Sequence, residues 1–107
     1  MTGSGALILL VEDEPQMRRF LRVALEGSGY RYLEAGTGQE GLAMAVQHRP
    51  ETILLDLGLP DMDGLEVVTR LREWSRAPVI VISARGREQD KIAALDLLWH
   101  RVRLRFN

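Results

Sequence analysis

The sequence contains no cysteine, and this absence excludes a disulfide framework and any chemistry that depends on a thiol. A chain without cysteine fits the reducing cytoplasm, which is where we expect it to work. An excess of charge of one sign is also lacking, because the formal net charge is only −1 at pH 7. Bulk charge therefore predicts neither nucleic-acid binding nor attachment to a membrane surface.

Long hydrophobic runs are lacking as well. An apolar run such as ALILLV at residues 6–11 is far shorter than the roughly 20 residues that a membrane-spanning helix needs. No basic segment followed by a long apolar stretch opens the chain, so we expect no secretory signal peptide. The 107 residues have the size of one domain that buries about 60–65% of its unfolded surface.

What the sequence does contain is an alternation of short apolar segments with helical patterns. Continuous apolar runs at residues 6–11 and 52–56 predict buried strands, and so does the β-branched run at 79–83. Residues 30–35 alternate more weakly and predict one further strand. Each of these segments is separated from the next by a stretch of about the length of a helix.

The helical stretches have recognisable beginnings and inward faces. Pro15 suits a first helical turn, Thr37 and Glu40 form a capping-box pair, and Gly64 opens a third helix. A fourth helix is expected to begin near Arg87. The predicted inward faces of the first three helices are, in order, Met17, Phe20, Leu21 and Ala24; Leu42, Ala45 and Val46; and Val67, Leu71 and Trp74.

Strands that alternate with helices predict an α/β fold with a doubly wound parallel sheet and helices on both faces. In such sheets, ligands bind at the carboxyl ends of the strands. Glu12 and Asp13 follow the first strand, Asp56 ends the third, and Ser83 ends the fourth. We therefore expect these four side chains to meet at one edge of the sheet.

Three carboxylates in one partly buried pocket repel one another, by about 4 kcal/mol per pair at 4 Å and an effective dielectric constant near 20. They must either take up protons or surround a cation. Oxygen ligands without histidine or cysteine favour Mg²⁺ or Mn²⁺ over zinc. Asp56 could then act as a nucleophile that forms an aspartyl phosphate, and the Ser83 hydroxyl could donate to a phosphoryl oxygen.

A simpler interpretation exists for each of these acids. A single acid at the end of a strand usually caps a helix or lies in a solvated loop. Asp61 and Asp63 are assigned to turns and helix caps rather than to a metal site. The joint placement of acids after the first and third strands favours the shared metal site.

Three segments carry a resemblance to a known family. LILLVEDEP at residues 7–15, ILLDLGLPDMDGLEV at 53–67 and PVIVISARGREQDKIAALD at 78–96 resemble the receiver domain of two-component response regulators, in the OmpR/PhoB-like class. The resemblance covers about residues 6–96. It implies a single receiver-like domain over residues 1–107 with a divergent tail at 97–107.

The resemblance implies a flavodoxin/CheY-like fold of three layers and a role for each residue that matches a motif. Asp56 is the phospho-acceptor, and Glu12 and Asp13 form the acidic pair. The backbone carbonyl of Gly58 completes the ligands of Mg²⁺ (or Mn²⁺), and Ser83 senses the phosphoryl group. The implied partner is a sensor histidine kinase. The implied activity is that of a signalling switch with possible autophosphatase activity, as part of a transcriptional regulator.

The sequence departs from the family after residue 96, where it reads LLWHRVRLRFN. The family continues there with a fifth strand, a lysine and a fifth helix, so we expect an incomplete fold without a DNA-binding domain and without direct contact to DNA. No lysine follows Lys91. Loss of one preorganised charge contact can lower a rate by about 10²–10³, so we expect slow or absent phosphorylation.

Residues 97–106 fit two structures. Alternation of apolar residues with arginines suits a short strand, whereas the three-four spacing of apolar residues over 92–106 suits a continued fourth helix. In either case the missing elements would leave apolar faces uncovered, which predicts a homodimer or domain-swapped oligomer through the 92–106 tail.

The sequence leaves two other functions to compare with this one. One is a receiver-derived dimerisation or binding module that works without phosphorylation. The other is a phosphatase of the haloacid-dehalogenase kind, which needs a second acid two residues after its nucleophile. Position 58 is glycine, which argues against that enzyme.

Overall fold

The computed structural model describes residues 6–82, in which strands and helices alternate. The elements are β1 (Leu7–Val11), α1 (Pro15–Gly27), β2 (Arg31–Ala35), α2 (Gly38–His48), β3 (Thr52–Asp56), α3 (Gly64–Leu71) and β4 (Val79–Ile82). This order confirms the four predicted strands and the first three predicted helices. The predictions for the fourth helix, for the 92–106 tail and for an incomplete C-terminal part concern residues outside the described ones.

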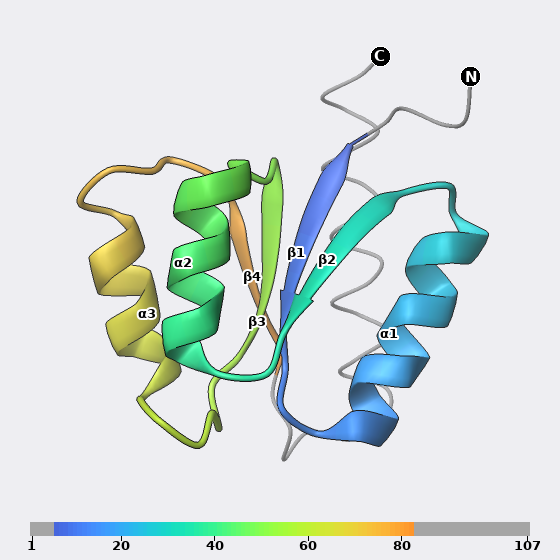
Figure 1. The fold of residues 1–107 in the computed structure, drawn as a ribbon, viewed down its shortest axis with the longest axis horizontal. Coiled ribbons are helices and arrows are strands. Elements are labelled where there is room, and N and C mark those ends of the chain that lie inside the picture. The colour runs from blue at the N-terminus through green and yellow to red at the C-terminus, as the bar shows by residue number, and fades with distance from the viewer. Residues whose placement is uncertain (1–5, 83–107) are drawn as a thin grey trace.

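All four strands are parallel and lie in the order β2-β1-β3-β4. Figure 1 shows α1 on one face of this sheet and α2 and α3 on the opposite face. The chain moves outward from β1 to β2, then crosses back to β3 on the other side of β1. This reversal places a topological switch point between β1 and β3, and it confirms the doubly wound, three-layered arrangement.

The alternation of side chains along the strands divides the core in two. In β1, Ile8 and Leu10 point to the α1 face, whereas Leu9 and Val11 point to the face covered by α2 and α3. The first half contains α1 through Met17, Leu21 and Leu25. The second half contains α2 and α3 through Ala45, Val67 and Leu71. Because β1 and β3 are covered on both faces, their sequences are continuous apolar runs rather than alternating ones.

Helix α2 packs against the sheet through its small residues. A Cβ atom on Gly41 would lie 2.9 Å from Cγ2 of Val11, so only glycine allows this approach without a shift of the valine. Gly38, Gly41 and Ala45 are the buried residues of α2. Thr37 accepts a hydrogen bond from the backbone N–H of Glu40 at 3.0 Å, which confirms the predicted cap.

Three residues predicted to face inward are exposed to solvent over a third or more of their surface. Phe20 is 38% exposed, because α1 buries the stripe Met17, Leu21 and Leu25 instead. Val46 is 57% exposed, because the buried face of α2 consists of the small residues named above. Trp74 is 47% exposed, because α3 ends at Leu71 and the tryptophan lies in the turn that follows. Within residues 6–82, no helix is long and apolar enough to span a bilayer.

Candidate metal centre

Neighbouring strands bring three carboxylates together at one edge of the sheet. Glu12 comes directly after β1, and Asp56 is the last residue of β3. The two strands pair in parallel with Val11 opposite Leu55, so their ends coincide. Glu12, Asp13 and Asp56 each offer one carboxylate oxygen, and the three oxygens all lie within 4.8 Å of one another. The predicted convergence of these acids is therefore confirmed.

The backbone fixes Glu12 in this cluster, and its side chain is fully buried. Its N–H donates to the carbonyl of Ala35 at 2.9 Å, and its Oε2 accepts from the N–H of Glu14 at 3.0 Å. Its Oε1 is buried and has no hydrogen-bond partner among residues 6–82. Burial raises the pKa of Glu12 to about 7; the N–H of Glu14 opposes this shift and the carboxylate of Asp56 adds to it.

Asp56 is also completely buried, at the end of the central strand β3. Its Oδ1 accepts a hydrogen bond from the N–H of Gly58 at 3.2 Å, which fixes the orientation of the carboxylate. Asp13, in contrast, is exposed at the mouth of the cluster. The arrangement thus combines two acids held by the core with one that reaches solvent.

Of the two other predicted site residues, Gly58 and Ser83, the structure describes only Gly58. The structure places Gly58 beside Asp56, but the predicted role of its carbonyl as a metal ligand stays a prediction. A Cβ atom on Gly58 would lie 3.8 and 3.9 Å from the Asp56 oxygens, which is ordinary contact, so space alone does not require glycine there. Ser83 lies outside the described residues.

The loop after Asp56 uses its acids as helix caps, as the sequence predicted. Asp63 accepts from the N–H of Leu65 at 2.9 Å and caps α3. Asp61 accepts from Gly38 N–H at 2.7 Å and from Gln39 N–H at 2.9 Å, at the beginning of α2. These hydrogen bonds lower the pKa of Asp61.

The long-range contact of Asp61 could not be inferred from the sequence. A cap is normally found within a few residues of its helix, whereas Asp61 is separated from Gly38 by 23 positions. The local signal, an acid in a turn, gives the type of interaction but not the helix that it caps.

The acidic cluster fits a hard divalent cation. Two of its carboxylates are buried side by side, where their mutual repulsion is expensive unless a proton or a positive ion lies between them. Glu12 Oε1 is a buried acceptor without a donor in the described part of the chain. Carboxylate oxygens are the ligands that Mg²⁺ prefers, at about 2.0–2.1 Å from the ion.

Sequence comparisons give one family for this chain. The family model described as the response regulator receiver domain matches residues 8–101. The chain is 61% identical over 89 residues to the KDP operon transcriptional regulatory protein KdpE of Escherichia coli, strain K12, which covers 83% of this chain and 40% of that protein. It is 50% identical over 90 residues to the transcriptional regulatory protein KdpE of Mycobacterium tuberculosis, covering 84% of this chain and again 40% of the relative. The chain thus spans about two-fifths of the length of these relatives.

Comparison with solved structures gives the same fold. The chemotaxis response regulator CheY4 of Vibrio cholerae superposes with a TM-score of 0.73 at 28% identity, over 85% of this chain and 81% of that one. A CheY-like response regulator receiver domain protein from Methanospirillum hungatei superposes with a TM-score of 0.72 at 26% identity, over 87% of this chain and 75% of that one. Sequence and fold therefore point to the same family.

Proposed function

We propose, from the fact that this chain belongs to the response regulator receiver domain family, that Asp56 accepts a phosphoryl group from a sensor histidine kinase. Receiver domains are phospho-acceptors rather than stand-alone enzymes. The observation that supports this proposal most directly is the cluster of Glu12, Asp13 and Asp56, whose ligand oxygens lie within 4.8 Å of one another. A phospho-acceptor needs a carboxylate held rigidly beside a source of positive charge; Asp56 is such a carboxylate, and the cluster offers oxygen ligands that could hold a divalent cation beside it.

The transfer is a displacement at phosphorus. A carboxylate oxygen of Asp56 attacks the phosphoryl group on the kinase histidine, and the P–N bond breaks with its electron pair going to the imidazole. Strand β3 holds Asp56 in place, and the N–H of Gly58 fixes one of its oxygens. In this proposal Glu12, Asp13, Asp56 and the Gly58 carbonyl would hold Mg²⁺ or Mn²⁺. When bound, such an ion would supply positive charge to the phosphoryl oxygens.

The proposal includes two finer points on residues beyond β4. The Ser83 hydroxyl donates a hydrogen bond to the transferred group and so senses its presence. No lysine follows Lys91 among the 107 residues, so in this proposal the transfer proceeds without the cation that the family places against the phosphoryl oxygens. We therefore expect phosphorylation to be slower than in receivers with that lysine by about 10²–10³.

Intact-mass measurement tests the proposal. The protein is incubated with Mg²⁺ and a small acyl-phosphate donor, and the mass gain of one phosphoryl group is followed with time. We expect a slow gain that disappears in Asp56→Asn. Asp63→Asn is the matched control, because it makes the same chemical change at a residue that caps α3, and it should keep the gain. A gain that persists in Asp56→Asn would contradict the assignment of the acceptor, and a rapid stoichiometric gain would contradict the expected impairment.

The role within a larger regulator is also a proposal. The relatives are named transcriptional regulatory proteins, and the chain spans about two-fifths of their length. We infer that this segment is the receiver part of such a regulator and makes no direct contact with DNA. A titration of DNA with the 107-residue chain should therefore show no binding at physiological salt.

A second candidate function is an assembly module that works without phosphorylation. Phe20 and Val23 on α1 are exposed apolar residues, which suits a contact surface. The predicted homodimer or domain-swapped oligomer through the 92–106 tail would use such a surface. Light scattering on the unmodified protein and on Asp56→Ala distinguishes the two functions: unchanged dimers in the variant favour the module, and monomers in both exclude it.

A further inference from the structure

A second concave site lies at the rim of the sheet opposite the acidic cluster. A cavity of about 610 Å³ opens between the end of α2 and the turn that follows α3. Its floor is Ile53, near the start of β3, whereas Asp56 ends the same strand. The volume lies within the range of about 300–1,000 Å³ that is typical of small-molecule sites. This cavity has no part in the phosphoryl transfer proposed above.

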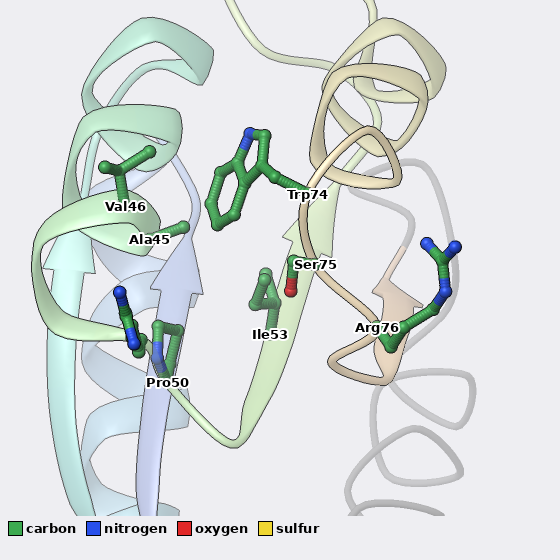
Figure 2. Close-up of a pocket in the computed structure, with 8 residues that line it drawn as sticks. Ala45, Val46, Pro50, Ile53, Trp74, Ser75 and Arg76 are labelled. Carbon is green, nitrogen blue, oxygen red and sulfur yellow. The ribbon is translucent and has the colours of Figure 1, made fainter.

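One wall of the cavity is an aromatic ring. Figure 2 shows the indole of Trp74 standing between the α2 residues Ala45 and Val46 and the β3 residue Ile53. Trp74 is 47% exposed although its ring is a large apolar surface. Such a ring, with apolar neighbours around it, is a surface on which a planar ligand can stack.

Two arginines, Arg49 and Arg76, complete the lining. Arg49 lines the cavity and has no salt-bridge partner among residues 6–82. It ends α2 with φ at 49°, the one non-glycine residue of the described chain with positive φ, and its N–H donates to Ala45 O at 3.0 Å. Backbone strain of this kind is often found at functional sites. Arg76 also borders the cavity, but its guanidinium points away from Trp74 and donates to Arg72 O at 2.9 Å.

The turn that carries Trp74 is fixed before any ligand arrives. Nη1 of Arg72 donates to the carbonyls of Ser75 at 3.2 Å and of Ala77 at 2.8 Å. The N–H of Ala77 donates to the Ser75 hydroxyl at 3.1 Å, and the N–H of Ser75 donates to Leu71 O at 2.7 Å. The Ser75 hydroxyl therefore accepts within the turn, and its own proton stays available for a hydrogen bond. A wall ordered in this way reduces the entropy that binding would cost.

We propose that this cavity binds a small molecule that combines a planar ring with an anionic group. The ring stacks on Trp74, and the anion lies against the guanidinium of Arg49 with the Ser75 hydroxyl as a second donor. Guanidinium groups bind carboxylate and phosphate through paired hydrogen bonds, so either anion satisfies the site. The ligand is therefore a nucleoside monophosphate or an aromatic carboxylate.

Calorimetric titration of the full chain with four probes tests the proposal. AMP and benzoate carry a ring and an anion, adenosine carries only the ring, and inorganic phosphate carries only the anion. We expect at least one of the first two to bind with a Kd below about 1 mM, and about tenfold more tightly than adenosine or phosphate. The stronger of AMP and benzoate shows which of these two combinations of ring and anion the cavity prefers. The proposal is overturned if neither AMP nor benzoate binds at about 1 mM. It is also overturned if adenosine or inorganic phosphate binds as tightly as they do.

Variants then locate the binding. Arg49→Asn removes the charge while keeping a residue that tolerates a left-handed backbone, and Trp74→Leu removes the ring while keeping apolar bulk. Each should weaken binding by about 10- to 100-fold. Arg76→Gln removes the same charge at a guanidinium that points away from Trp74. The affinity of this variant for the ligand should therefore stay within about twofold of that of the unmodified protein. Thermal melting confirms that each variant is folded. Undiminished binding in folded Arg49→Asn, or in folded Trp74→Leu, would place the ligand elsewhere and overturn the assignment.

Discussion

Glu12 is the residue at which the energetics of the acidic cluster are most directly measurable. Burial raises its pKa to about 7 from the ordinary value of 4.5. Below pH 4.5 it is protonated in both folded and unfolded states, and between 4.5 and 7 only the unfolded state gives up the proton. Without divalent cations, the free energy of unfolding should therefore fall by about 3 kcal/mol as pH rises through this window and change little from this group above it. Urea unfolding at a series of pH values measures this fall in the free energy of unfolding.

The Glu12→Gln variant is the control for this pH dependence. Glutamine keeps the size of the side chain but has no proton to lose, so the fall in stability between pH 4.5 and 7 should shrink to that of the remaining groups. Saturating Mg²⁺ should restore stability to the unmodified protein at pH 8, because a ligand that binds only the folded state stabilises it. An equally steep fall in Glu12→Gln would show that another group titrates.

Gly64 marks a place where backbone packing requires the absence of a side chain. A Cβ atom there would lie 2.7 Å from Cα of Leu57 and 3.1 Å from the carbonyl oxygen of Asp56, so the backbone itself would have to move. Gly64→Ala should lower the free energy of unfolding by about 1–3 kcal/mol, measured in urea. The matched change Gly58→Ala meets only ordinary contacts and should cost less than about 0.5 kcal/mol. An equal loss of stability in Gly64→Ala and Gly58→Ala would mean that the backbone adapts at both positions.

At the scale of elements, Asp61 joins the loop after β3 to the first turn of α2. Its carboxylate accepts from Gly38 and Gln39, and these N–H groups lower its pKa. A lowered pKa means that the ionised form stabilises the fold at neutral pH and that this contribution is lost as pH falls through the folded-state pKa. Asp61→Asn should therefore lower the melting temperature at pH 7 and reduce its dependence on pH below 4. Circular dichroism melts check both effects.

Asp63→Asn is the comparison for Asp61→Asn, because Asp63 caps only the helix that follows it. Asp63→Asn keeps an oxygen that can accept from the N–H of Leu65, whereas Asp61→Asn replaces one of two accepting oxygens with an amide NH₂ group. Only the Asp61 variant therefore loosens the contact between the β3–α3 loop and α2. Hydrogen exchange at Gly38 and Gln39 should increase in Asp61→Asn and stay unchanged in Asp63→Asn. Unchanged hydrogen exchange in both variants would show that the long-range cap by Asp61 adds little to the local stability of α2.

The sequence predicts elements well where a local signal decides them. The cap at Thr37 and the proline at the start of α1 are such signals, and both helices begin where they indicate. Inward faces are predicted less well, because they depend on what each helix packs against. Phe20 and Val46 are apolar and correctly spaced, yet α1 buries the Met17, Leu21 and Leu25 stripe and α2 buries small residues. Hydrophobicity alone does not show that a close approach selects glycine and alanine.

At the scale of the whole molecule, parallel topology is what made the acidic cluster predictable. Once β1 and β3 are strands of one parallel sheet, Glu12 and Asp56 must emerge at the same edge, although 44 positions separate them in the sequence (56 − 12). No comparable rule predicts the cavity at the opposite rim. It depends on where α3 stops and on the turn that presents Trp74, which the helical spacing had placed inside.

The two rims of the sheet should therefore bind their ligands independently. Asp13 is exposed at the mouth of the acidic cluster, so Asp13→Asn removes a charge with little risk to folding. We expect this variant to weaken Mg²⁺ binding by at least about tenfold, since one carboxylate of three is lost. Arg49 lies beyond the other end of β3, so Arg49→Asn should keep the Mg²⁺ affinity within about twofold of that of the unmodified protein. Calorimetry with Mg²⁺ measures both; a comparable loss in Arg49→Asn would reveal coupling through β3 between the cavity and the acids.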